Sequence, residues 1–447
     1  MRRIYPLIIC SLLATIGQAQ VMTLQQCITT GIDHNLSLAS ARISIDKSRT
    51  GISQNQARLL PVVNGLFQFT DYLKRPVNVT TGTLLGSDFP DDPKWQTIRS
   101  MQYNANAGIQ LTVPVYNQTI LCAIDVARTM ENIASLSYDK TVDDLTLQIS
   151  KVYYMAQASL EQQRLTEENI QRMEQLCDIT EALYGNGVVM EVDLNRVRIN
   201  LKNLQTLLDQ WQTVHSQQLN MLRFLIDIAP ECPLEVTAMG DKVDDIAATD
   251  VNTNLPELLV AQGQIALAEQ QLRAVKSGYV PSIAFTGYAG GIDYQEKFHH
   301  FFHTSAATDN WFGNCYIGVS IKIPIFDGNS KKLQMKQHRL DRQQASINME
   351  LTQKKLNERN LDAQLQLRHN IEVLSTQSES RRQAEEVYNV TEEQYKEGVQ
   401  SMTALLQDEM QLRQAQTACV EALCQCRLAQ LELLKLSGNL SVLSRQQ

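Results

Sequence analysis

A run of histidines, "HHFFH" from His299 to His303, is the group of side chains best placed to bind a metal. Imidazole nitrogens are frequent ligands of transition metals, but a stable site needs further ligands in a fixed geometry. No further ligand accompanies the run, and it falls at the expected end of a strand, where aromatic side chains gather. We therefore expect interface aromatics with accompanying histidines, and no bound metal or other cofactor.

The sequence carries no motif of an enzyme active site. A phosphate-binding loop, a nucleophile elbow and a zinc-binding helix motif are all absent from it. Its acidic residues are scattered along expected helix faces, where they are usually solvated charge. We expect no enzymatic activity and no catalytic residue.

Charge and hydropathy exclude two further classes of protein. The 447 residues carry a net charge of −8 and a pI near 5.5, which argues against a nucleic-acid partner because such proteins present a basic face. After the N-terminus, no run of about 20 apolar residues occurs, so a membrane-spanning helix is not expected.

The N-terminus, residues 1–19, has the pattern of a secretory signal peptide. Two arginines precede an apolar run from Ile4 to Ile16, and the expected cleavage follows Ala19. Cys10 follows Ile9 and Cys27 follows two glutamines, so neither suits a lipid anchor. The eight cysteines after Ala19 are scattered in an exported chain, and we expect them to act as small apolar residues.

One turn occurs twice in the chain. "YGNGVVMEVDLNRVRINL", Tyr184 to Leu201, returns in altered form as "YKEGVQSMTALLQDEMQL", Tyr395 to Leu412. Each copy places a tyrosine-x-x-glycine turn before a long amphipathic helix, and glycine ends a helix well because it accepts a left-handed conformation.

Other segments repeat in the same order, which predicts an internal duplication. Pro61 and Pro281 fall at equivalent points of two matching helix-to-strand segments, and "GIQLTVPVYN" from Gly108 matches "GVSIKIPIFD" from Gly318. We expect a first repeat over 20–228, an equatorial connector over 229–252 and a second repeat over 253–447.

Each repeat contains two expected strands with period-two alternation. They cover about 62–79 and 101–116 in the first repeat, and about 282–298 and 315–327 in the second. Apolar and polar side chains alternate, and aromatic residues cluster toward the strand ends, which is typical of transmembrane β-barrel strands.

A very long helix follows each strand pair. The intervals from about 118 to 183 and from about 329 to 394 contain neither proline nor glycine, so each helix would be roughly 100 Å long. The return helices place leucines, and in the second repeat also alanines and cysteines, on coiled-coil positions. His215 falls on the same line and is expected to be a packed or solvated helix residue.

These elements require an oligomer if the strands cross a membrane. Four strands cannot close a barrel, and an open edge cannot face lipid. Three copies would give a 12-stranded barrel continuous with a tube of helices, although the sequence does not select three copies over four. A periplasmic coiled-coil scaffold without a pore is the rival, and the alternating strands argue against it.

The sequence resembles the TolC-like outer-membrane efflux proteins over nearly all of the chain after residue 19. The resemblance rests on "MTLQQC" at Met22, the Pro61 and Pro281 junctions, "VPVY", "IPIF" and the paired turns. It implies a mainly α fold with membrane β, in which a long coiled-coil helical barrel continues a 12-stranded β-barrel shared by three protomers.

The resemblance also implies a function. The chain would be a passive exit duct in the outer membrane of a Gram-negative bacterium, with a periplasmic helical tunnel and outer-membrane lipid around its barrel. Its partners would be two further copies, a periplasmic adaptor (membrane fusion) protein and an inner-membrane pump. Drug or small-molecule export is the first reading, and a duct for one-step protein secretion or metal efflux is the alternative.

In that family the turns form the periplasmic entrance and the docking surface for the adaptor. The corresponding residues here are Tyr184, Gly185, Gly187, Tyr395 and Gly398. The adaptor docking site is therefore expected at the two turns.

The family closes this entrance with an aspartate bonded to the second tyrosine and to an arginine. Asp193 and Tyr395 match two of these positions, whereas Gln400 occupies the arginine position. A hydrogen bond to a charged group contributes about 1.5–3 kcal/mol and a neutral one about half of that. We expect an entrance that is held more weakly.

An acidic constriction of the lumen is less well supported. The aspartate positions of family members that have one are occupied by Ala404 and Gln407, and Asp408 and Glu409 follow them. These two acids are the possible constriction residues, and spacing does not tell whether either faces the lumen.

Overall fold

The computed structural model describes residues 20–81, 95–240, 251–301 and 311–443. The expected signal peptide lies outside these residues, as do His303 and part of the connector. The chain forms two compact units. A sheet unit comprises 46–132 and 264–344, and a helical unit contains the rest.

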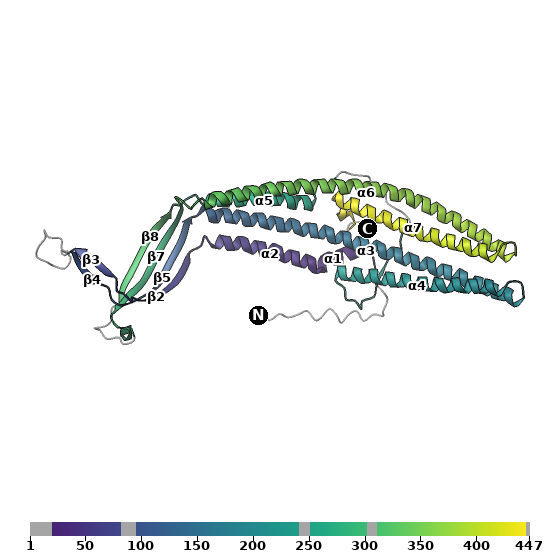
Figure 1. Cartoon of the computed structure of the whole chain (residues 1–447), viewed down its shortest axis with the longest axis horizontal. Helices are drawn as coiled ribbons and strands as arrows, with labels where there is room; N and C mark the ends of the chain where they lie inside the picture. The colour runs from purple at the N-terminus through teal and green to yellow at the C-terminus, as the bar shows by residue number, and fades with distance from the viewer. Residues whose placement is uncertain (1–19, 82–94, 241–250, 302–310, 444–447) are drawn as a thin grey trace. The chain divides into compact units, whose positions relative to one another are not determined.

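The sheet unit holds one antiparallel sheet of four strands, built from both halves of the chain (Figure 1). The strands are β2 (Val62–Asp71), β5 (Tyr103–Tyr116), β7 (Ser282–Gln295) and β8 (Trp311–Lys322), in the order β2-β5-β7-β8. The four expected strands are therefore present. Within the described residues, β2 and β8 each pair on one side only, so the sheet is open at both edges.

The expected strand bounds need correction at three places. The first strand ends at Asp71, and β3 (Val77–Thr81) pairs with β4 (Trp95–Arg99) in a separate ladder. Pro76, which has no N–H to donate, lies in the break between them. The third strand ends at Gln295, before a short 3₁₀ helix at Phe298–Phe301, and the fourth ends at Lys322, before Pro324.

The register gives this sheet two chemically different faces. Directly paired residues share a face, so the row Val63–Leu111–Gly287–Ile317 lies on one side and the row Asn64–Gln110–Tyr288–Tyr316 on the other. The first side continues as an apolar face with Phe67, Ile109 and Val319. The second is a polar face of amide, hydroxyl and tyrosine side chains, on which Tyr288 stacks on Tyr316 with 5.6 Å between ring centroids.

The long helices have the expected extent. Helix α3 spans Gln118–Gly185 and α6 spans Ser330–Lys396. At 1.5 Å per residue each is roughly 100 Å long. Shorter helices run beside them: α2 (Leu36–Ala57), α5 (Pro256–Ser277), α4 (Glu191–Ile226) and α7 (Met402–Leu436). No described helix is long and apolar enough to cross a membrane.

The helical unit contains two helical hairpins, α3–α4 and α6–α7 (Figure 1). The coiled-coil positions expected in the return helices are largely buried, among them Val197 and Leu204 in α4 and Leu405 and Leu412 in α7. Cys419 and Cys426 are also buried, and neither forms a disulfide bond with a described residue. One apolar cluster joins side chains of all four helices near the turns.

A second core lies where α1 (Leu24–His34) packs against α3 and α4. Tyr153 donates a hydrogen bond of 3.0 Å to the Met22 carbonyl and contacts Thr237 at 2.8 Å. The expected connector supplies β6 (Leu234–Val236), which pairs in parallel with β1 (Gln20–Met22). The ends of the first half are therefore tied together by main-chain bonds.

The sheet depends on a close approach at Gly108. A Cβ at Gly108 would lie 2.5 Å from the Tyr288 hydroxyl, which bonds to Asn106 Oδ1 at 2.5 Å. We expect Gly108→Val to break this partly buried bond and lower the unfolding temperature by several degrees, since a lost hydrogen bond costs about 1 kcal/mol and overpacking about 1–3 kcal/mol. Gly313→Val in β8 is the control, because open space surrounds that position. Equal melting temperatures by circular dichroism would contradict the packing argument.

Candidate functional site: the hairpin tips and the polar seam above them

The two turns have the same backbone geometry. In the first, Val188 N–H donates to the Leu183 carbonyl at 2.9 Å and Gly187 N–H to the Tyr184 carbonyl at 2.9 Å. The second repeats both bonds, from Val399 to Gln394 and from Gly398 to Tyr395. Gly187 and Gly398 have φ of +73° and +77°, so each turn is a Schellman motif that needs glycine at this position.

The tyrosines of the two turns differ in exposure. Tyr184 is 43% exposed, whereas Tyr395 is 6% exposed and belongs to the apolar cluster near the turns. The Tyr395 hydroxyl has no hydrogen-bond partner among the described residues. Val188, Met190 and Val399 are also exposed, so the tips carry apolar side chains at the surface of the chain.

Asp193 pairs with a cation that the spacing argument missed. Its carboxylate lies 3.1 Å from Arg196 Nη1, and the same nitrogen donates to Thr403 Oγ1 at 3.2 Å. Asp193 and Arg196 belong to α4 and Thr403 to α7, so this group links the two hairpins. Among the described residues, the Gln400 side chain accepts one hydrogen bond, from the N–H of its neighbour Ser401, and its own N–H donates to the Gln394 carbonyl. Within one chain, the described contacts do not include a hydrogen bond between Asp193 and Tyr395.

The two possible constriction acids have different surroundings. Asp408 is half-buried and accepts a 2.7 Å hydrogen bond from Thr391 of α6. Glu409 is only 5% exposed and accepts a 3.3 Å hydrogen bond from Asn200 of α4. This burial among the helices of its own chain goes against a lumen-facing role for Glu409.

Burial raises the pKa of the Glu409 carboxyl, because desolvation outweighs the nearby charges of Arg413 and Arg172 and the Asn200 hydrogen bond. Its other oxygen, Oε1, is buried without a partner among the described residues. A protonated carboxyl is cheaper to bury than a carboxylate. The packing of α7 on α4 is therefore linked to protonation of this group.

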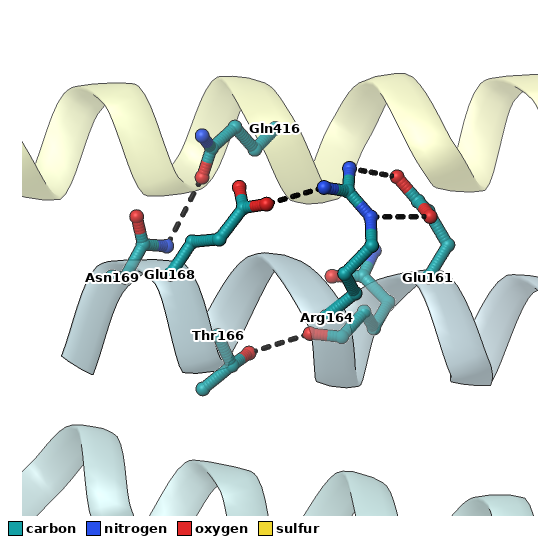
Figure 2. A network of polar contacts seen from close by, with 7 residues as sticks. Glu161, Arg164, Thr166, Glu168, Asn169 and Gln416 are labelled. Carbon is teal, nitrogen blue, oxygen red and sulfur yellow. Dashed lines mark hydrogen bonds and ion pairs between the residues drawn. The ribbon is translucent and has the colours of Figure 1, made fainter. Parts of the chain in front are cut away.

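A seam of buried polar side chains joins α3 to α7 above the tips (Figure 2). Asn169 donates to Gln416 at 3.0 Å, and Gln162 donates to the Thr417 carbonyl at 3.2 Å. Thr166 bonds back to the Gln162 carbonyl, while Arg164 pairs with glutamates of its own helix on the exposed side. The two hairpins therefore meet through amides here, and a leucine-based pattern search does not find them.

His215 is part of this packing. Its Nδ1 lies 3.0 Å from Ser159 Oγ and 3.1 Å from the Ala156 carbonyl, and burial lowers its pKa. The expectation of a packed residue is confirmed. Near the sheet, the rings of His299 and His300 are 4.3 Å apart. The described residues contain no group of three or more metal-binding side chains.

These features define a class of protein that has paired helical hairpins with Schellman tips and an open, two-faced antiparallel sheet. The profile of the family described as outer membrane efflux protein matches residues 29–226 and 249–439. The chain belongs to this family. The gap between the matched ranges, 227–248, overlaps most of the expected connector, 229–252.

Relatives and solved structures agree with this assignment. The chain is 23% identical to the probable efflux pump outer membrane protein TtgC of Pseudomonas putida over 89% of this chain and 79% of that one. It is 21% identical to TolC of Escherichia coli over 57% of this chain and 53% of that one. The fold resembles VceC of Vibrio cholerae, with a TM-score of 0.70, 15% identity and coverage of 93% of this chain and 96% of that one. The fold also resembles CusC, with a TM-score of 0.74, 15% identity and coverage of 95% of this chain and 94% of that one.

The buried acid makes stability depend on pH in a defined direction. Because the folded-state pKa of Glu409 lies above the ordinary value of a glutamate, about 4.5, its packing is fully favourable below about pH 4.5 and loses stability as the pH rises through the raised pKa. We expect Glu409→Gln to raise the denaturation midpoint at pH 8 and to leave it unchanged at pH 4.

The exposed Glu397→Gln, at the second turn, is the matched control and should have no such effect. Urea titrations followed by tryptophan fluorescence at both pH values measure the difference. A Glu409→Gln variant that is less stable than the parent at pH 8 would show that the carboxylate stabilises the packing instead.

Proposed function

We propose that three copies of this chain form a channel in the outer membrane of a Gram-negative bacterium, the passive exit duct of an efflux pump. The four-stranded sheet carries the proposal, because it is open at both edges and has one apolar and one polar face. A continuous ring of such sheets would turn the apolar faces to lipid and the polar faces to a water-filled lumen.

The strand order suits closure between copies. All three pairings are antiparallel, so β8 runs opposite to β2, and β8 of one copy can pair with β2 of the next in the same antiparallel manner. Every edge would then be satisfied, and three copies would supply 12 strands, an even number within the range of known barrels.

The apolar face has the height that a membrane requires. Its rows extend from Ile283 to the row of Asp293, Ala105 and Phe69, a span of ten residues along β7. At about 3.3 Å per residue and a strand tilt of about 40°, this span covers roughly 25 Å of the bilayer.

The hairpin tips would then lie at the periplasmic end of a helical tunnel. Three copies would place six tips in a ring, and their exposed apolar residues, with Tyr184, Gly187 and Gly398, would form the docking surface for a periplasmic adaptor protein bound to an inner-membrane pump. Small molecules are the cargo that we favour. Relatives in Pseudomonas putida are named as components of a toluene efflux pump and of an antibiotic efflux pump.

The mass of the detergent-extracted protein tests the shared barrel. We expect a trimer of the 50.4 kDa chain, less any cleaved leader, in the outer-membrane fraction by light scattering corrected for detergent. A barrel of this kind should also migrate faster on a gel before boiling than after it. A monomer, or a protein recovered from the soluble periplasm, would overturn the channel and favour the scaffold.

Asp193 and Arg196 are proposed to hold the entrance closed, with Arg196 supplying the charge that Gln400 lacks. The contact between the hairpins is the Arg196–Thr403 hydrogen bond, and Asp193 holds Arg196 in place for it from the same helix. At this half-exposed site the contact should contribute about 1 kcal/mol. Asp193→Ala should therefore weaken the contact and raise the single-channel conductance in planar bilayers. Glu191→Ala is the control, because Glu191 is exposed and lies in the same helical turn. Unchanged conductance in Asp193→Ala and Arg196→Ala would exclude this latch.

A further inference from the structure

Six exposed cations gather at one end of the sheet. They are Arg58, just after α2; Arg273 and Lys276, at the end of α5; and Lys332, Lys336 and Arg339, at the start of α6. Strands β2 and β7 begin at this end of the sheet, and β8 ends there. Helices α2, α5 and α6 therefore meet the sheet at the same end. We call these six residues the junction belt.

The junction belt has no counterions among the described residues of the chain. None of the six lies in an ion pair with a described carboxylate, although their neighbour Lys331 pairs with Asp327 at 3.3 Å and Arg342 pairs with Glu269. The segment Ser330–Arg339 carries four cations and no acid, in a chain with 48 acidic and 40 basic residues. The positive charge is therefore concentrated locally in an acidic protein.

Its geometry fits a flat, anionic surface. Lys332, Lys336 and Arg339 are spaced by four and three residues, which places them on one side of α6. Leu333 and Leu340 lie on a neighbouring side and are 64% and 56% exposed. The cations thus form a stripe along the first turns of the helix.

Between the belt and the apolar face lies a set of aromatic side chains. Tyr116, Tyr279 and Phe326 are exposed at the strand-to-helix junctions, and Lys331 Nζ lies 5.1 Å from the centre of the Tyr279 ring. Along the unit, an apolar band is followed by aromatic and then by cationic residues. A lipid leaflet has the matching order of acyl chains, interface and phosphate groups.

We propose that the junction belt binds the phosphate groups of anionic glycerophospholipids in the leaflet that faces the periplasm. This inference rests on the proposed outer-membrane channel, since it needs the apolar face in lipid. The belt would fix the depth of the sheet in the membrane and recruit a shell of anionic lipid. Long cationic side chains suit this role because their aliphatic stems can lie along the apolar band.

The experiment titrates the purified, detergent-solubilised protein with phosphatidylglycerol or phosphatidylcholine and follows the thermal unfolding midpoint. The test variant is Lys332→Gln/Lys336→Gln/Arg339→Gln. The control, Lys355→Gln/Arg359→Gln/Arg368→Gln, removes the same charge from exposed positions of the same helix, at least 16 residues, or roughly 24 Å, farther along it.

Phosphatidylglycerol should stabilise the parent and the control more than phosphatidylcholine does, and this difference should weaken in high salt. In the test variant, the apparent affinity for phosphatidylglycerol should fall by roughly 10- to 100-fold, since a cation near an anionic surface contributes about 1 kcal/mol. An equal response in the test and control variants would overturn the inference.

The reversal potential in a potassium chloride gradient distinguishes a junction belt that faces lipid from one that lines the lumen. If the three cations lined the lumen, the test variant would change the ion selectivity while its lipid response stayed normal, and the lipid site would be wrong. The mass and the channel activity of the parent protein are measured before any lipid is added. If the parent formed neither a trimer nor a channel, the proposed function itself would be wrong.

Discussion

The unpaired backbone of β2 and β8 is the constraint on which the proposed assembly depends. A strand edge in hydrocarbon leaves N–H and C=O groups without partners, and each such group costs several kcal/mol. The chain satisfies β5 and β7 by itself and leaves one edge on each side. Within the proposed function, neighbouring copies are therefore part of the fold, because a single chain cannot place its apolar face in lipid.

The long helices α3 and α6 also depend on neighbouring elements, because they must bury their apolar side chains. A helix of 68 residues, with no proline and with its one glycine, Gly185, at the last position, has few ways to bury its apolar side chains alone. The chain solves this by bringing α4 and α7 back along α3 and α6, so that apolar clusters and amide bonds hold the hairpins together. Many apolar residues of α6 remain exposed, among them Leu333, Leu340 and Ile347. In the proposed assembly, a neighbouring copy would cover such residues.

Much of this architecture could be predicted from local signals. The ends of α3 and α6 follow from the absence of helix breakers, and the turn glycines follow from the left-handed conformation that a Schellman motif requires. Alternation predicted the four strands, because each has one apolar side. The separate β3–β4 ladder was not predicted. The expected first strand, 62–79, runs across Pro76, where the observed ladder is interrupted.

The tip chemistry was harder to predict because it depends on contacts between elements. The spacing from the second glycine marks Gln400 as the place for a cation. The cation that pairs with Asp193 is instead Arg196, which lies one turn after Asp193 in α4. Likewise, Asp408 and Glu409 are adjacent in sequence but have different surroundings. A helix turns by about 100° per residue, so neighbouring acids face different partners.

The polar seam and the hairpin tips are held together by different kinds of contact. Apolar packing is non-directional and tolerates sliding, whereas an amide pair such as Asn169–Gln416 is satisfied at one register only. Buried polar groups cost free energy when their partners move away. The seam therefore fixes the height of one hairpin on the other, while the tips below it rely on an apolar cluster and on the Asp193–Arg196–Thr403 contacts. If the hairpins separate to open an entrance, the tips can part with fewer unsatisfied groups than the seam, so opening should begin at the turns and stop at the amides.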